Sequence, residues 1–220
     1  MVRETAEDYD RGRRREDAHK LLENVTFVTF NYDRCLEFFL INALTKVYGD
    51  QNLARGIVTS ARIIHVYGTV GALPALTGSE NSEEGRIGFG GGPGAGPELD
   101  RYLHFPSLVG RIKTYTEQIK DKAHLDGVQW DIERCEQLFF LGFGYHQPNI
   151  DLLQTDGKNG ASRIFGSMFG MPAASVPFVR GRMGKLLRDS VRSHLPYAID
   201  LNRELTCAAM IDEFRETLIG

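Results

Sequence analysis

The fold class of this chain is decided by one stretch, Val25-Thr26-Phe27-Val28-Thr29-Phe30-Asn31-Tyr32-Asp33-Arg34. Its first six residues are apolar, β-branched or aromatic, which is typical of a strand buried on both faces of a parallel sheet. The apolar run stops at Asn31, and a helical pattern follows from about Arg34 to Tyr48. A polar cluster therefore stands at the carboxyl end of a strand, where open α/β sheets bind their ligands.

Similar strands and helices are expected along the rest of the chain. One apolar stripe at helical spacing follows the first strand, and it comprises Leu36, Phe39, Leu40, Ala43, Leu44 and Val47. Further strands are expected at about Ile63–Val66, Leu138–Leu141 and Arg163–Phe165, in addition to the first at Val25–Phe30. Short β-rich runs that alternate with amphipathic helices predict an α/β fold of three layers, Rossmann-like, with a mostly parallel sheet. We expect a charged lead-in over residues 1–24 and a single domain over residues 25–220.

Composition limits the classes of function. The chain has 220 residues, 42% of them hydrophobic and 25% charged, as in an ordinary globular domain. The formal net charge of -3 predicts no direct binding to nucleic acid or to acidic membranes. No apolar run approaches the roughly 20 residues of a membrane span, and no signal core follows Met1, so we expect a cytoplasmic protein. The three cysteines fit no zinc pattern, and we expect buried thiols and no metal.

Several other segments carry expectations of their own. The glycine-rich run 88–97 contains two prolines and lacks a strand before it, which favours a surface loop over a phosphate loop. A helix is expected from Pro106 to about Ile119. The basic stretch 178–193 allows an anion-facing or a merely exposed helix. Asn202 is expected to cap a last amphipathic helix.

Polar or glycine residues follow each of the predicted strands. His65 falls near the end of the second strand, Gly142-Phe143-Gly144 follows the third, and Gly166-Ser167 follows the fourth. Two glycines after a buried strand let a ligand approach the main chain closely. Asn31, Asp33 and His65 at neighbouring strand ends predict a shared site, and we expect Gly142–Gly144 to line the same cavity.

These motifs resemble the sirtuin-like family. Asn31-Tyr32-Asp33, His65-Val66-Tyr67-Gly68 and Gly142-Phe143-Gly144 occur in the family's order, and the resemblance spans roughly residues 25–150. They are most similar to the bacterial branch of NAD-consuming domains, which is common in antiphage defence. The resemblance implies a sirtuin-like fold, NAD as substrate or ligand, and no zinc module, because the four-cysteine module of sirtuin deacylases has no counterpart here.

The resemblance also implies roles for individual residues. Asn31 would position the attacking water and the ribose hydroxyls, His65 would act as general base, and Asp33 would bind the carboxamide of nicotinamide. Gly142, Phe143, Gly144, Gly166 and Ser167 would contact the nucleotide part of the cofactor. The implied activity is an NAD glycohydrolase, which cleaves the nicotinamide–ribose bond.

One departure from the family keeps alternatives open. No Gly-Ala-Gly-x-Ser loop precedes Val25, so the chain is either a fragment or a member that has lost this half of the cofactor site. A non-catalytic module that senses NAD or ADP-ribose, or an inactive fragment of a larger protein, is the alternative to an enzyme. The expected partner is a small nucleotide ligand, and a homo-oligomer or additional domains remain open.

Overall fold

The computed structural model of the chain describes residues 17–69, 122–155, 160–192 and 195–219. The chain divides into two compact units, Met1–Gln118 and Ile119–Gly220, and each is described by itself. Most of the charged lead-in, the glycine-rich run 88–97 and the helix expected from Pro106 lie outside the described residues. The single domain expected over residues 25–220 remains a prediction.

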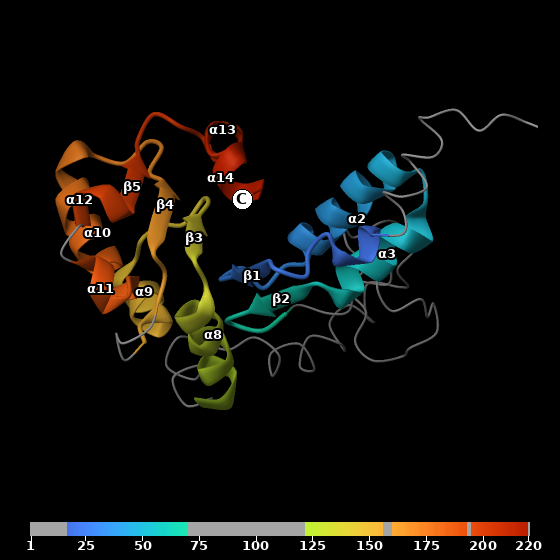
Figure 1. Ribbon diagram of the computed structural model, residues 1–220, viewed down its shortest axis with the longest axis horizontal. Helices are drawn as coiled ribbons and strands as arrows, with labels where there is room; N and C mark the ends of the chain where they lie inside the picture. The colour runs from blue at the N-terminus through green and yellow to red at the C-terminus, as the bar shows by residue number, and fades with distance from the viewer. Residues whose placement is uncertain (1–16, 70–121, 156–159, 193–194, 220) are drawn as a thin grey trace, which may run out of the picture. The chain divides into compact units, whose positions relative to one another are not determined.

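The first unit contains two parallel strands with two helices between them in sequence (Figure 1). Its described elements are η1 (Ala18–Lys20), β1 (Thr26–Thr29), α2 (Cys35–Tyr48), α3 (Gln51–Ser60) and β2 (Arg62–His65). The strands pair in parallel, with Phe27 opposite Ile63 and Thr29 opposite His65. The carboxyl ends of β1 and β2 therefore lie side by side, as a β-α-β connection requires.

Helices α2 and α3 pack against each other over a small apolar core. Its fully buried members are Ala18, Ile41, Leu44, Ala54, Ile57 and Val58. The apolar stripe expected on α2 is partly wrong, because Phe39 and Val47 are 68% and 73% exposed while Ile41 is 2% exposed. Strand β1 is also only half buried, whereas the sequence predicts burial on both faces.

The turn between α2 and α3 is set by two adjacent residues. Gly49 has φ +66°, a left-handed conformation that glycine adopts without strain, and its N–H donates to the Thr45 carbonyl. The Asp50 side chain then accepts from the main-chain N–H groups of Asn52 and Leu53. Both features are ordinary helix caps, so the sequence itself directs this reversal between the two helices.

The second unit contains a three-stranded parallel sheet in the order β3-β4-β5. Its strands are β3 (Gln137–Phe140), β4 (Arg163–Ser167) and β5 (Ile199–Asn202). Its helices are α8 (Lys122–Arg134), α9 (Gln147–Leu153), η2 (Ala173–Ser175), α10 (Val176–Met183), η3 (Gly184–Leu186), α11 (Asp189–Arg192), α12 (Leu195–Ala198), α13 (Cys207–Glu213) and α14 (Arg215–Ile219). Strand β4 lies in the centre, and four of its five residues are buried.

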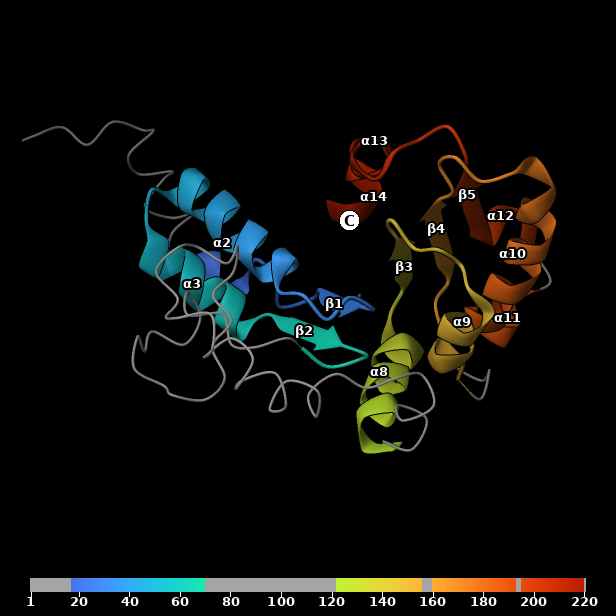
Figure 2. The same cartoon turned by 180° about the vertical axis from the view of Figure 1, so that it is seen from behind.

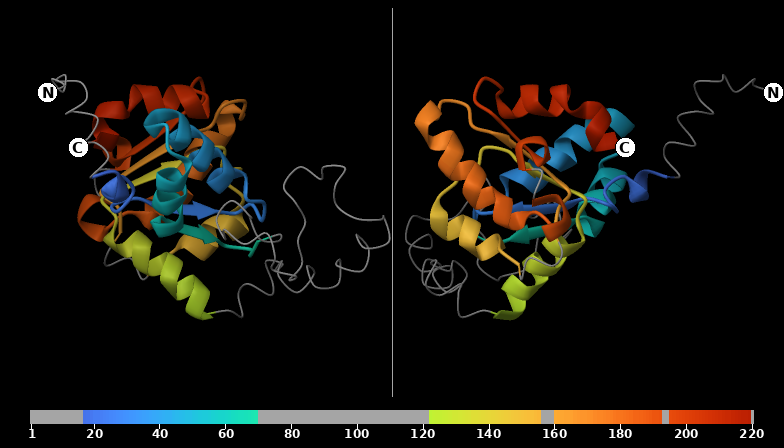
Figure 3. Two further views of the ribbon diagram at one scale, coloured as in Figure 1. Left: turned by 90° about the vertical axis from the view of Figure 1, so that its right-hand side faces the viewer. Right: turned by 60° about the vertical axis from the view of Figure 1, so that its left-hand side comes forward.

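Helices cover this sheet from two sides. Helix α10 packs against β5 and α9, whereas α13 packs against β4. Figure 2 shows α9 to α12 on one side of the strands and α13 and α14 on the other, and the turned views in Figure 3 keep α10 (orange) apart from α13 (red). The centre of the core is Phe165, whose ring lies 4.6 Å from the rings of Phe139 and Phe214.

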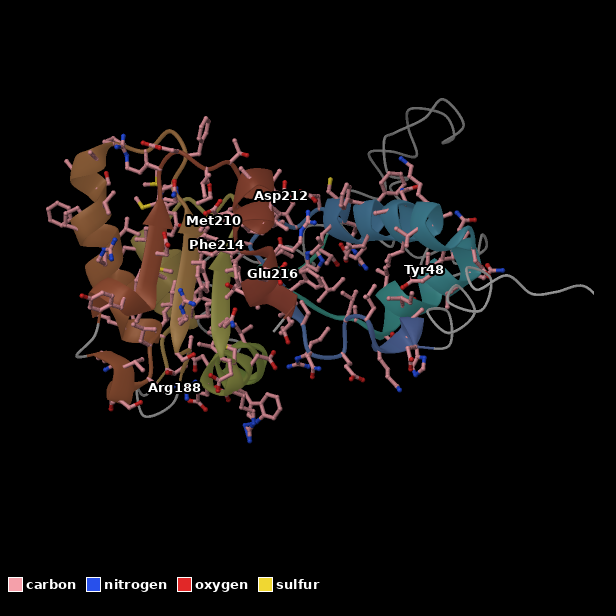
Figure 4. All side chains as sticks on the ribbon, turned by 45° about the horizontal axis from the view of Figure 1, so that its top comes forward. Tyr48, Arg188, Met210, Asp212, Phe214 and Glu216 are labelled. Atoms are coloured by element: carbon pink, nitrogen blue, oxygen red, sulfur yellow. The ribbon has the colours of Figure 1, made fainter. Side chains whose placement is uncertain are left out.

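The carboxyl-terminal segment differs from the sequence expectation in two respects. Strand β5 is not among the predicted strands, and Asn202 is its last residue rather than a helix cap. The cap of α13 is Thr206, whose side chain accepts from the N–H of Ala209. Met210 of α13 and Phe214, which follows α13 directly, lie on the side that faces the sheet, and Asp212 lies on the opposite side of α13 (Figure 4).

The described residues thus form an α/β structure in which every strand pair is parallel. The four predicted strands are all present, and their ends agree with the prediction to within two residues. None of the described helices is long and apolar enough to cross a membrane. A three-layer Rossmann-like arrangement of the whole chain remains a prediction.

Candidate functional site

The turn after β1 brings Asn31 next to His65 of β2. His65 Nδ1 lies 2.9 Å from the main-chain oxygen of Asn31. The main-chain N–H of Asn31 donates to Thr29 Oγ1 at 3.1 Å. The main chain of Asn31 is therefore held at both its N–H and its C=O, while the residue is exposed to solvent. The Asn31 side chain therefore makes neither of these two hydrogen bonds.

A buried carboxylate that sequence reasoning missed holds the other side of the His65 ring. Glu37, in the first turn of α2, is 2% exposed, and its Oε1 lies 2.9 Å from His65 Nε2. Arg34 Nε lies 2.6 Å from the same oxygen. We call Asn31, Arg34, Glu37 and His65 the histidine cluster. The spacing in the sequence could have indicated its burial, because Glu37 precedes the buried Ile41 by one helical turn and therefore lies on the same face of α2.

The pKa of Glu37 reflects two opposing influences. Burial by itself raises the pKa of this carboxyl group. The hydrogen bonds from His65 and from the main chain, together with the charge of Arg34, outweigh burial and hold the pKa below its ordinary value of 4.5. The folded protein therefore favours the ionised carboxylate.

The lowered pKa predicts a pH-dependent contribution to stability. Because the folded protein prefers ionised Glu37, this contribution is complete above the unfolded pKa and is lost as the pH falls through the folded pKa. We expect wild type to be more stable than Glu37→Gln at pH 7, and this difference to shrink below about pH 4. Urea unfolding of both proteins at pH 7 and pH 3, followed by circular dichroism, measures it. A difference that grows toward low pH would contradict the assignment.

Asp33 belongs to the same turn but has a structural contact as well. Its Oδ1 accepts from the main-chain N–H of Cys35, the first residue of α2, at 2.9 Å. The Cys35 thiol also hydrogen-bonds to Asp33, and this bond raises the pKa of the thiol. Asp33 is exposed, so its carboxylate is accessible to a ligand while it fixes the start of the helix.

Four of the five predicted cofactor residues of the second unit line a pocket at the carboxyl end of its sheet. The pocket has a volume of about 410 Å³, within the range of roughly 300–1,000 Å³ that small-molecule sites occupy. We call it the glycine pocket, and it is lined by Gly142, Phe143, Gly144, Ser167, Met168, Phe169, Met171, Thr206 and Cys207. Gly142, Phe143, Gly144 and Ser167 were predicted from sequence, whereas the other five residues were not.

Local structure explains two walls of the glycine pocket. Gly142, two residues after the end of β3, has φ +61°, a left-handed conformation that glycine adopts without strain, and it lines the pocket. Ser167 ends β4 and is 5% exposed, and its hydroxyl donates to the carbonyl of Leu205 at 2.7 Å. That hydrogen bond ties the end of β4 to the loop before α13, which carries Thr206 and Cys207. The pocket therefore depends on loops that follow three neighbouring strands.

Gly166 is buried beneath the pocket and does not line it. A Cβ atom at this position would lie 2.3 Å from Tyr145 Oη and 2.8 Å from Leu201 Cδ2. Tyr145 crosses over β4 here, and its hydroxyl donates to the Ser167 carbonyl at 3.1 Å. Burial raises the pKa of Tyr145 far above its ordinary value. Gly166 therefore makes room for a tyrosine that supports the pocket.

The basic stretch 178–193 is used within its own unit. Arg180 Nη1 donates to the Ile199 carbonyl at 2.8 Å, and Arg192 Nε donates to the Leu187 carbonyl at 2.9 Å. Arg188 forms an ion pair of 2.8 Å with Glu136, which lies directly before β3. These guanidinium groups hold helices and strands together. Three of the five basic side chains of the stretch therefore make contacts within the fold, and an anion-facing helix remains a prediction.

The three cysteines differ from the expectation of buried thiols. All three are free, Cys35 is exposed, and Cys135 and Cys207 are half buried. Burial raises the pKa of Cys135 to about 11. Within the described ranges, no three His, Cys, Asp or Glu side chains form a group that could hold a metal ion.

The sequence-predicted residues thus fall into two sets. Asn31, Asp33 and His65 come together in the first unit, and Gly142–Gly144 with Ser167 come together in the second. The prediction that both sets line one cavity joins the two units and remains a prediction. Comparisons of the chain with family models, with curated proteins and with solved structures found no match.

Proposed function

We propose that the chain binds NAD and hydrolyses its nicotinamide–ribose bond, as bacterial NAD-consuming members of the sirtuin-like family do, with a role in antiphage defence. The observation that carries this proposal is the glycine pocket. It lies at the carboxyl ends of parallel strands, where α/β folds bind nucleotides. Four of the five residues assigned to the nucleotide from the sequence line it.

The lining of the pocket suits part of a nucleotide. Phe143, Met168, Phe169 and Met171 offer apolar and aromatic surface for a base or a ribose. Gly142 and Gly144 lack side chains, so that a phosphate or ribose can approach the main chain closely. We therefore assign the ADP-ribose part of NAD to this pocket.

The proposal assigns the bond cleavage to the turn after β1. In the reaction, the bond between ribose C1′ and the nicotinamide nitrogen breaks, and a water oxygen forms the new bond to C1′ while its proton leaves to solvent or to a base. Asn31 is a suitable group to position this water, because its amide donates and accepts hydrogen bonds without carrying charge. Asp33 would hold the carboxamide of nicotinamide through its exposed carboxylate.

A second candidate function has one specific observation in its favour. Both ring nitrogens of His65 are engaged, by the Asn31 carbonyl and by Glu37, so the ring offers no lone pair to a substrate in this arrangement. A domain that senses NAD or ADP-ribose without cleaving it needs no such base. Incubating the purified chain with NAD and measuring released nicotinamide separates an enzyme from a sensor.

Filling the glycine pocket is expected to weaken nucleotide binding. A Cβ at Gly142 would lie 3.7 Å from Cys207 Sγ, so Cys207→Phe places a ring in the space that a ligand would use. We expect this variant to lower ADP-ribose affinity at least tenfold, about 1.4 kcal/mol, in calorimetric titration.

The matched control is Ala208→Phe, because Ala208 is the next residue on α13, is exposed and does not line the pocket. It should bind ADP-ribose like wild type. Equal affinity for Cys207→Phe and wild type would remove the pocket from the proposal.

A further inference from the structure

We propose that Arg203, in the loop after β5, binds the pyrophosphate of the nucleotide at the rim of the glycine pocket. Arg203 is not itself one of the lining residues, and no pattern in the sequence singles it out. This role rests on the proposed function, because it supplies the charged contact that binding of ADP-ribose needs.

The glycine pocket carries no charge of its own. Its lining consists of glycine, phenylalanine and methionine residues together with Ser167, Thr206 and Cys207. The hydroxyl of Ser167 already donates to the Leu205 carbonyl. The pyrophosphate of ADP-ribose carries two negative charges, and charge beside an apolar wall costs free energy unless a cation or hydrogen-bond donors accompany it. The chemistry of the ligand therefore calls for a cation close to this lining.

Arg203 is a cation that the structure places against the pocket wall. Its Nε donates to the main-chain oxygen of Met171, a lining residue, at 2.7 Å. The other hydrogen bonds and ion pairs of guanidinium groups described in this unit reach residues outside the lining. Among the described arginines of the unit, Arg203 is thus the one that is hydrogen-bonded to the pocket wall.

Most of the hydrogen-bonding capacity of Arg203 is left for a ligand. A guanidinium group has five N–H donors, and the Nε–H uses one of them. No hydrogen bond or ion pair with another described residue engages Nη1 or Nη2 of Arg203. The residue is exposed, so an anion from solvent can reach these groups. Parallel N–H groups on Nη1 and Nη2 match two oxygens of a phosphate.

Hydrogen bonds also fix the loop that carries Arg203. Asn202 Oδ1 accepts from the main-chain N–H groups of Glu204 and Leu205 at 2.8 and 3.0 Å. The Asn202 carbonyl accepts from the N–H of Met168, another lining residue, at 2.7 Å. The main chain of the loop is therefore tied to the pocket wall next to Arg203. A group that is held in place before the ligand arrives loses less conformational entropy on binding.

Titration with two ligands separates a phosphate contact from a structural role. ADP-ribose carries the pyrophosphate, whereas adenosine lacks it. We expect Arg203→Gln to lower the affinity for ADP-ribose roughly tenfold at low salt, because hydrogen bonds to a charged group are lost, and to leave the affinity for adenosine unchanged. NMR titration measures both ligands, including weak binding. Equal losses for both ligands would overturn the proposal, because Arg203 would then only hold Met171 in place.

The matched control is Arg215→Gln, which removes the same charge from an exposed residue of the same unit. Arg215 pairs with Asp212 at 2.9 Å, and neither residue lines the pocket. This variant should bind both ligands like wild type. The difference in ADP-ribose affinity between wild type and Arg203→Gln should shrink at high salt, because salt screens an exposed ion pair. An equal loss in Arg203→Gln and Arg215→Gln would indicate an effect of net charge alone and would overturn the proposal.

The result for Arg203 is distinguishable from the result for NAD cleavage. A chain that binds ADP-ribose through Arg203 but releases no nicotinamide supports the role of Arg203 and defeats the proposed hydrolysis. If the chain cleaves NAD and Arg203→Gln binds ADP-ribose like wild type, the proposed function stands and the role of Arg203 is overturned. A wild type that binds neither ADP-ribose nor adenosine overturns both.

Discussion

Asn31→Ala is expected to lower the rate of NAD cleavage at least roughly 10²-fold, since removing one preorganised hydrogen-bonding group from a reacting centre typically costs this much. The structure indicates that this substitution removes the side-chain amide without disturbing the main-chain contacts of the turn. The contacts of Asn31 with Thr29 and His65 use its main chain, and alanine keeps both. What is lost is the exposed amide alone, so ADP-ribose affinity and stability should be preserved.

Released nicotinamide, measured with wild type and variant at saturating NAD, tests this expectation. The matched control is Asn52→Ala, an exposed asparagine on α3 whose main-chain N–H is bound by Asp50. It should cleave NAD at the wild-type rate. Full activity in Asn31→Ala would remove Asn31 from the reaction, whereas equal losses in both variants would indicate general damage to the unit.

The strands that could be predicted are those with a continuous apolar run. The sequence predicts β1 and β2 within one residue of their observed ends, because Val25–Phe30 and Ile63–Val66 consist of apolar and β-branched residues apart from His65. Strand β5 is missed because Ile199-Asp200-Leu201-Asn202 offers only two apolar residues in alternation. So short an alternation of apolar and polar residues also occurs in many loops, and only the pairing with β4 makes this segment a strand.

In the candidate site, too, the features that depend on a local sequence pattern were predicted, whereas those that depend on contacts between distant residues were not. Asn31 and His65 were predicted to lie together because each stands at the carboxyl end of a strand, and their hydrogen bond joins them. Glu37 was missed because a carboxylate within a helix is most often exposed. Its burial depends on His65, which lies 28 residues away. Cys207 and Met168 were missed for a similar reason, since the pocket wall they form depends on how β4 and α13 pack.

The apolar stripe of α2 is the clearest failure of pattern reasoning. Phe39 and Val47 fit a helical stripe, yet both are largely exposed, and the buried side of the helix carries Glu37, Ile41 and Leu44. Two overlapping stripes are present on this helix because nearly all of its faces carry apolar residues. The elements that pack against α2 determine which stripe is buried, and hydrophobic periodicity alone does not predict this.

Gly166→Ala is expected to lower the free energy of unfolding of the second unit by about 1–3 kcal/mol, the usual cost of overpacking a core. The new Cβ would lie 2.3 Å from Tyr145 Oη, so the tyrosine must move. Its ring contacts Phe143, a pocket residue, with centroids 5.4 Å apart. ADP-ribose affinity should therefore fall together with stability, although Gly166 does not line the pocket.

Urea unfolding followed by tryptophan fluorescence measures the stability change, because the single tryptophan, Trp130, lies on α8 in this unit. The control is Gly181→Ala on α10, where an added Cβ meets no atom within 4 Å. This variant should be unchanged or stabilised by up to about 1 kcal/mol, because alanine favours a helix over glycine. If Gly166→Ala were as stable as wild type, Tyr145 would not depend on this glycine. The pocket would then owe its shape to the Gly142 turn and to the hydrogen bond between Ser167 and Leu205.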